Sequence, residues 1–199
     1  MMPRMALEHA LLVSLQERPA AGLELTRRFE KSIGFFWQAR HQQIYRVLAR
    51  MEADGWITAE TVAQRGRPEK RVYSVTDDGR AALAAWLATP SEAEPMRSDL
   101  AVKMRGAAYG DRSALLSHVA ETRTEHAARL RAYEAMVLRD YPDPAALTGS
   151  DLDRYLVLRG GVRLEQFWVA WLDEYLQAWF RDARLTARSS TTEEEKDTA

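Results

Sequence analysis

The sequence of 199 residues contains no cysteine. Disulfide bonds, thiolate catalysis and cysteine-based zinc sites are therefore excluded, and such a composition fits a reducing compartment. No stretch approaches the roughly 18 consecutive apolar residues of a membrane-spanning helix, and no basic segment at the N-terminus leads into the apolar core of a signal sequence. We therefore predict a cytoplasmic protein that does not enter a membrane.

Signatures of catalysis are also lacking. The sequence has no GxSxG element, no phosphate-binding loop, no dinucleotide fingerprint and no HExxH pair. Its acidic residues are spread along predicted helix faces rather than paired, and His9, His118 and His126 do not have the spacing of metal ligands. We therefore predict a protein that is not an enzyme and that has no metal site and no cofactor.

An excess of one charge is missing as well, because the formal net charge is -1 at pH 7. The charges are nevertheless unevenly distributed. Residues 1–88 hold 13 Lys and Arg against 10 Asp and Glu, whereas residues 89–199 hold 15 against 19. Four cations surround a Gly-Pro turn in the first part: Arg65, Arg67, Lys70 and Arg71. This segment is either a solvated hairpin tip or a loop that lies along a phosphate backbone.

Hydrophobic periodicity predicts three helices at the start of the chain, over residues 6–17, 22–32 and 39–54. The third carries Ile44, Val47, Leu48 and Met51 on one stripe, and Gly55 is well placed as its C-terminal cap.

The period then changes to that of strands. Residues 56–62 and 71–75 predict a β-hairpin, and Thr76 is placed to cap a fourth helix. We expect the buried stripe of this fourth helix to comprise Leu83, Trp86 and Leu87.

Two prolines and weak periodicity mark residues 89–97 as a linker. Beyond it the pattern predicts only helices, over residues 98–108, 112–141 and 151–183, followed by a polar tail over 186–199 that we expect to be disordered. The predicted fold is mainly α, with an N-terminal domain over 1–88 and an all-α domain over 98–185.

Three helices followed by a hairpin and a fourth helix are the plan of a winged helix-turn-helix, whose third helix enters the DNA major groove. The segments QQIYRVLARMEADGWI and RGRPEKRVYSVTDDGR resemble the PadR-type transcriptional regulators. The matching positions are Gln43, Ile44, Tyr45, Leu48, Glu52 and Gly55 in the helix, and Gly66, Arg67, Pro68, Tyr73, Val75, Thr76 and Gly79 around the wing. Residues 6–88 carry this resemblance.

In a winged helix-turn-helix of this kind, two groups of residues are placed to contact DNA. At the start of the third helix, Arg and Gln side chains can bond to guanine and adenine edges, and residues one turn further along can reach phosphate. Wing cations would bind phosphate by releasing counterions. The candidate DNA-binding residues are Gln38, Arg40, His41, Gln42, Tyr45, Arg46, Arg65, Arg67, Lys70 and Arg71.

The C-terminal helices resemble the dimerisation region of one branch of the family. Aromatic residues recur along the last of them, which indicates either a packed face, which we expect to lie between subunits, or a ligand site. The candidate effector-binding residues are Trp37, Trp168 and Trp171. The implied partners are operator DNA, a second copy of the chain and a small aromatic effector that releases a repressor. The alternative is a winged-helix module that binds other proteins without reading DNA sequence.

Overall fold

The structure is a computed structural model that describes residues 6–31, 41–64, 67–91 and 97–197. It divides into two compact units, Met1–Glu94 and Pro95–Ala199. Over the described ranges, no helix combines the length and the apolar character that crossing a membrane requires. The fold class predicted from the sequence, mainly helical with a small wing in the first unit, is confirmed.

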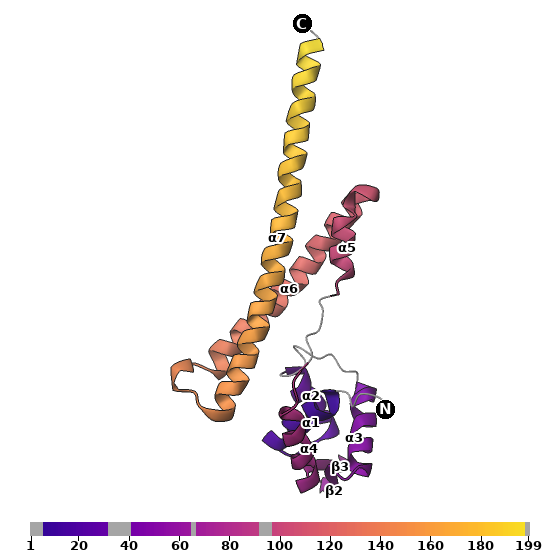
Figure 1. The fold of residues 1–199 in the computed structure, drawn as a ribbon, viewed down its shortest axis with the longest axis vertical. Helices are drawn as coiled ribbons and strands as arrows, with labels where there is room; N and C mark the ends of the chain where they lie inside the picture. Colours follow the sequence, from indigo (N-terminus) through magenta and orange to yellow (C-terminus); the bar gives the residue numbers. More distant parts are fainter. Residues whose placement is uncertain (1–5, 32–40, 65–66, 92–96, 198–199) are drawn as a thin grey trace. The chain divides into compact units, whose positions relative to one another are not determined.

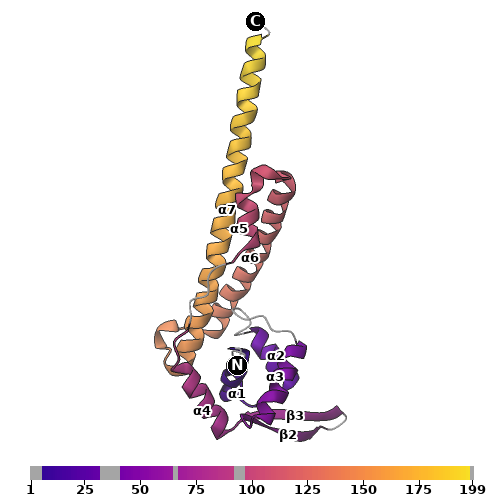
Figure 2. The same cartoon turned by 45° about the vertical axis from the view of Figure 1, so that its right-hand side comes forward.

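Over its described residues, the N-terminal unit contains four α-helices and a three-stranded antiparallel sheet of order β1-β3-β2 (Figure 1). Figure 2 shows the β2–β3 hairpin extending away from the helices as a ribbon. The elements are α1 (Ala6–Glu17), β1 (Ala20–Ala21), α2 (Gly22–Lys31), α3 (His41–Ala53), β2 (Ile57–Gln64), β3 (Arg67–Val75) and α4 (Asp77–Leu87).

One apolar core joins these elements. Leu11 and Leu12 of α1, Leu25 of α2 and Ile44 and Leu48 of α3 have no exposed surface, and β3 adds Tyr73 to the same cluster. Each such side chain contributes about 1.5–3 kcal/mol when it leaves water. The helical spacing of these residues in the sequence therefore fixes which face of α3 points inward and which is left for a partner.

The end of α3 is closed by a glycine in the left-handed region. Gly55 has φ 75°, and the N–H of Trp56 donates to the Met51 carbonyl at 2.8 Å while the N–H of Gly55 donates to that of Glu52 at 3.1 Å. These two bonds form a Schellman motif. The predicted cap is confirmed, and it turns the chain directly into the hairpin.

Thr76 joins the base of the hairpin to α4. Its hydroxyl accepts a hydrogen bond from the Gly79 N–H at 3.1 Å and donates to the Gly55 carbonyl at 2.6 Å. Its own N–H donates to the Trp56 carbonyl at 3.1 Å. The predicted N-cap is therefore confirmed, and the same side chain also holds the end of α3 against the start of α4.

In the part of the C-terminal unit that the structure describes, every regular element is a helix or a 3-10 turn, as expected. It comprises α5 (Asp99–Arg105), a 3-10 turn at Ala107–Tyr109, α6 (Arg112–Asp140), a second 3-10 turn at Pro144–Ala146, and α7 (Gly149–Asp197). Ser98 and Asp111 cap α5 and α6 through their side-chain oxygens. The helices α6 and α7 lie side by side, and α5 covers part of both.

Three features differ from the sequence-based expectations. The strand β1 was not predicted, because two alanines carry no strand pattern and only their pairing with Tyr73 and Val72 defines it. The predicted stripe of α4 is buried only at Leu83, since Trp86 is 37% and Leu87 is 65% exposed. The prediction of a disordered tail over 186–199 also differs from the structure, which continues α7 to Asp197. Extending an existing helix avoids the cost of nucleating one, and the run Glu193, Glu194, Glu195 and Lys196 in the tail consists of residues that favour helix.

Candidate nucleic-acid interface

The outward face of α3 is polar. His41, Gln42, Tyr45 and Arg46 are exposed, whereas Ile44, Val47, Leu48 and Met51 lie in the core. Gln42, Tyr45, Arg46 and Ala49 follow one another at helical spacing and so share a side of the helix. The exposed face thus carries an amide, a phenol and a guanidinium. The amide and the phenol can both donate to and accept from base edges, and the guanidinium can donate to base edges and to phosphates.

Tyr45 is held in place by the start of α2. A Cβ added at Gly22 would stand 2.5 Å from a carbon of the Tyr45 ring, so the glycine allows the ring to lie against the backbone of α2. The ring remains 44% exposed. The position that the family resemblance marks as tyrosine therefore combines a packing role with an exposed phenol.

The two arginines of α3 have different surroundings. Arg50 forms an ion pair with Glu8 of α1, a side chain that is 3% exposed. Arg46 lies one turn earlier and is exposed. Because a buried carboxylate is costly without a cation beside it, Arg50 serves mainly to neutralise Glu8. Of the two, Arg46 is the one available to an outside anion.

Arg71 connects the wing to α3. Its guanidinium donates to Glu52 at 2.7 Å and lies over the ring of Tyr73, 5.6 Å from the centroid. Arg71 is still 55% exposed, and a guanidinium has five N–H donors. The residue can therefore hold its place between α3 and β3 and present the remaining donors to a phosphate.

Lys70 points to a different helix. Its ammonium lies 3.3 Å from Glu24 of α2, which also binds Arg18 at 2.8 Å and lies 3.7 Å from Arg28. Burial acts to raise the pKa of Glu24, but the hydrogen bond from Lys70 and the charges of Lys70, Arg28 and Arg18 together hold this pKa below its ordinary value. The carboxylate is thus ionised at neutral pH.

Several predicted site residues fall outside the described residues: Trp37, Gln38, Arg40 and Arg65. For Arg67 the structure describes the backbone, as the first residue of β3. The remaining candidates, His41, Gln42, Tyr45, Arg46, Lys70 and Arg71, all lie on α3 or β3 of the same unit. Sequence reasoning missed Glu24, Arg18 and Arg28, because nothing in the sequence links Glu24 to a lysine 46 positions away.

Trp168 and Trp171 pack inside the C-terminal unit of a single chain. Both lie against a cluster formed by Met104, Val119 and Leu172. Both side chains are only partly buried, so the expectation that these aromatics pack between subunits stays a prediction. Within the chain, α5 and α6 cover this side of α7, and the Tyr175 hydroxyl donates to the Met104 carbonyl at 3.2 Å.

A charged network lies beside Trp168. Its ring stacks on His126 at a centroid distance of 5.0 Å, and Glu165, which is 9% exposed, contacts both His126 at 2.6 Å and Arg129 at 3.2 Å. Burial, and then the charge of Glu165, raise the pKa of nearby Tyr133. Arg123 and Asp173 add a two-bond ion pair between α6 and α7. These contacts fix the two helices against each other.

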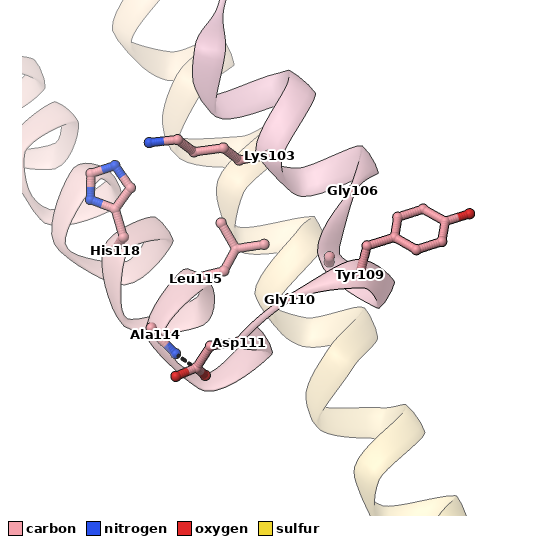
Figure 3. A pocket seen from close by; sticks show the side chains of 9 residues that line it. Lys103, Gly106, Tyr109, Gly110, Asp111, Ala114, Leu115 and His118 are labelled. Carbon is pink, nitrogen blue, oxygen red and sulfur yellow. Dashed lines mark hydrogen bonds between the residues drawn. The ribbon is translucent and has the colours of Figure 1, made fainter.

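An open groove of about 420 Å³ lies at the corner between α5 and α6. Figure 3 shows Lys103 and His118 reaching toward the same space above Leu115, while Tyr109 points away from it. The Asp111 carboxylate accepts a hydrogen bond from the Ala114 N–H at 3.0 Å. Among the residues that the structure describes, no cluster of three or more His, Asp or Glu side chains could hold a metal ion.

The N-terminal unit has the features that define a winged helix-turn-helix. An exposed polar helix follows two core helices, and a two-stranded hairpin with basic residues is tied to that helix by Arg71 and Glu52. The class of protein defined by this fold and site is a winged-helix regulator with an added helical unit.

Comparisons with known proteins identify the family. Residues 11–85 match the family described as "Transcriptional regulator PadR-like family", and residues 96–179 match "Virulence activator alpha C-term". The chain is 50% identical over 184 residues to the probable transcriptional regulator Rv1176c of Mycobacterium tuberculosis, covering 87% of this chain and 97% of that protein. It belongs to the PadR-like family of transcriptional regulators, as the sequence motifs had indicated.

Two further relatives have solved structures. The negative transcriptional regulator PadR of Bacillus subtilis is 28% identical over 175 residues, covering 85% of this chain and 95% of that protein. Its complex with operator DNA superposes with a TM-score of 0.75 at 26% identity, over 87% of this chain and 99% of that one. The structure of the virulence activator AphA of Vibrio cholerae superposes with a TM-score of 0.71 at 31% identity, over 92% of this chain and 99% of that one.

Proposed function

We propose that this protein is a sequence-specific DNA-binding regulator that acts as a dimeric repressor and is released by a small-molecule effector. The observation that carries the DNA-binding part is the ion pair between Arg71 of the wing and Glu52 of α3. It fixes a basic strand beside the helix whose exposed face carries Gln42 and Arg46. The Bacillus subtilis relative, which has the same fold, is solved on operator DNA.

The two parts of the site have different tasks on DNA. Gln42 lies near the start of α3, where a glutamine can bond to both N6 and N7 of adenine, so we assign it to base reading. His41 lies beside it on the same exposed end. Tyr45, Arg46 and the wing cations are assigned to phosphates, which position a protein without reading sequence. We keep Gln38, Arg40, Arg65 and Arg67 as predicted members of the same two groups.

Dimerisation is assigned to α7. Leu156, Val157, Leu164 and Phe167 are each 43–55% exposed in the single chain, and their spacing places them on one face of the helix. Gly160 lies on that same face and is exposed, so a second helix can approach closely there. Burial of this face against its copy gives the two-fold symmetry that a paired operator needs.

We take the proposed sign of regulation and the proposed class of effector from the Bacillus subtilis relative. It is a negative regulator and has been solved in complex with p-coumaric acid, a small aromatic acid. By analogy, this protein is proposed to be a repressor that leaves DNA when a small aromatic compound binds. Effector contact by Trp37, Trp168 and Trp171 stays a prediction, and a change in tryptophan emission on adding hydroxycinnamic acids would test it.

The experiment is a selection of bound duplexes from a randomised pool by the wild type, by Gln42→Ala and by Arg71→Ala. Base reading by Gln42 predicts that its variant selects a different consensus, whereas the Arg71 variant selects the same consensus with weaker binding. An unchanged consensus for Gln42→Ala would remove this residue from base reading. In parallel, light scattering of Leu164→Glu is expected to show a monomer where the wild type is a dimer. A dimeric variant would contradict the role of this face.

A further inference from the structure

Glu24 is surrounded by more cations than it can neutralise. Its carboxylate contacts Arg18 at 2.8 Å, Lys70 at 3.3 Å and Arg28 at 3.7 Å. With all four groups charged, this cluster keeps two positive charges. Arg28 is committed elsewhere as well, because it donates to the carbonyls of Ser14 and Arg18 at 3.1 and 2.9 Å.

Lys70 is the member of this cluster that lies on the wing. It follows Glu69 on β3, and Val72, two residues further along the strand, pairs with Ala21 of β1 just before α2 begins. The side chain of Lys70 is 34% exposed, and that of Glu24 is 37% exposed. Both groups can therefore be reached by solvent ions and by a DNA backbone at the hairpin.

The two wing cations differ in how they can respond to DNA. Arg71 has donors left over after binding Glu52, whereas Lys70 is a compact point charge that Glu24 already neutralises in part. A phosphate gains the full attraction of the Lys70 charge only when Glu24 moves away. The anion of DNA and the carboxylate of α2 thus compete for the same ammonium group.

We propose that Glu24 is an internal competitor for the DNA backbone, which restrains the affinity of the wing for DNA of any sequence and so raises the selectivity for the operator. The inference rests on the proposed DNA-binding function. On random DNA, Lys70 stays with Glu24 and contributes little. On the operator, base contacts by α3 hold the wing close enough for Lys70 to exchange the carboxylate for a phosphate.

The test compares the wild type with Glu24→Gln, an isosteric change that removes only the charge. Dissociation constants for a non-operator duplex are measured by anisotropy at four salt concentrations. Gaining one phosphate contact is expected to raise this affinity roughly 3- to 10-fold near about 0.1 M salt and to steepen the slope of log K against log salt by about 0.9. The preference for the operator over the non-operator duplex falls accordingly.

Two further variants separate competition from other effects of the substitution. Glu60→Gln removes an exposed carboxylate from β2 of the same hairpin, and it should change the affinity by much less than Glu24→Gln. In the double variant Glu24→Gln with Lys70→Gln, the increase in affinity for the non-operator duplex over the wild type should disappear. Circular dichroism and thermal melts confirm that each protein is folded before its DNA binding is compared.

Several outcomes would overturn the inference. Equal or weaker binding by folded Glu24→Gln, with the wild-type salt slope, would show that Glu24 orders the wing instead of competing with DNA. A gain that persists without Lys70, or one matched by Glu60→Gln, would also contradict it. If the wild type binds all duplexes equally while Glu24→Gln binds them more tightly, the proposed sequence reading and the gain in selectivity fail, whereas the competition between Glu24 and phosphate stands. Absence of any DNA binding at low salt would overturn both.

Discussion

The substitution Gly79→Ala tests the junction between the hairpin and α4. Gly79 is buried in the first turn of α4. A Cβ at this position would stand 3.0 Å from the carbonyl carbon of Trp56 and 2.9 Å from Cγ1 of Val75, and closer still to the Trp56 carbonyl oxygen. Because the first and last of these atoms belong to the backbone, rotation of a side chain cannot make room.

Two opposing effects decide the result. Alanine favours a helix over glycine by about 1 kcal/mol. Against this, overpacking costs about 1–3 kcal/mol or more, and moving Trp56 away disturbs the hydrogen bond from the Thr76 N–H to its carbonyl, 3.1 Å long, which adds about 1 kcal/mol. We expect a net loss of about 2 kcal/mol or more, which for a unit of this size lowers its Tm by roughly 8 °C or more.

Scanning calorimetry of the full chain measures this shift, and hydrogen exchange at the Thr76 and Gly79 amides locates it. The matched control is Gly106→Ala, because a Cβ there meets nothing closer than 3.5 Å and should change the Tm little. A melting temperature of Gly79→Ala equal to or above that of the wild type would refute the close approach of Gly79 to Trp56.

Three further predictions concern single interactions. Thr76→Val removes the hydroxyl that binds Gly79 and Gly55, so urea unfolding should show a loss of about 1–2 kcal/mol in the N-terminal unit, and an unchanged midpoint would deny its capping role. Leu172→Ala opens a cavity at a fully buried position and should cost about 2–5 kcal/mol in the C-terminal unit; a loss below 1 kcal/mol would contradict the assigned core. The pKa of Glu24 is held below its ordinary value of 4.5, so its ion pairs stabilise the fold above that pH and are lost as the pH falls through the lowered pKa. The stability difference between wild type and Glu24→Gln, measured by urea unfolding at pH 7 and pH 3, should therefore shrink at pH 3, and an equal difference at both would contradict this.

Local rules were enough to predict the elements that carry the site. The stripe of Ile44, Val47, Leu48 and Met51 predicted both the existence of α3 and its buried face, and all four side chains are buried. Gly55 and Thr76 were predicted as caps from residue type and position, because caps depend on a few neighbouring backbone groups. Both make the expected contacts.

Contacts between distant segments were not predictable in this way. The pairing of Lys70 with Glu24, and of Arg71 with Glu52, depends on how the hairpin crosses the helices, and no local pattern encodes that. The same holds for Trp86, which faces His9 of α1 at a ring distance of 4.5 Å and stays partly exposed. Counting charges in the sequence therefore overstated how much of the positive charge of Lys70 and Arg71 is available to DNA, since each is paired with a carboxylate.

The central claim is that α3 and the wing together read a DNA sequence. Its most direct test is an anisotropy titration of the purified protein against the intergenic DNA upstream of its own gene, with excess competitor and at two salt concentrations. The account predicts tight binding that resists the competitor and weakens steeply as salt rises. A folded dimer that shows no preference for this DNA over the competitor at either salt concentration would contradict it and favour a winged-helix module that binds other proteins.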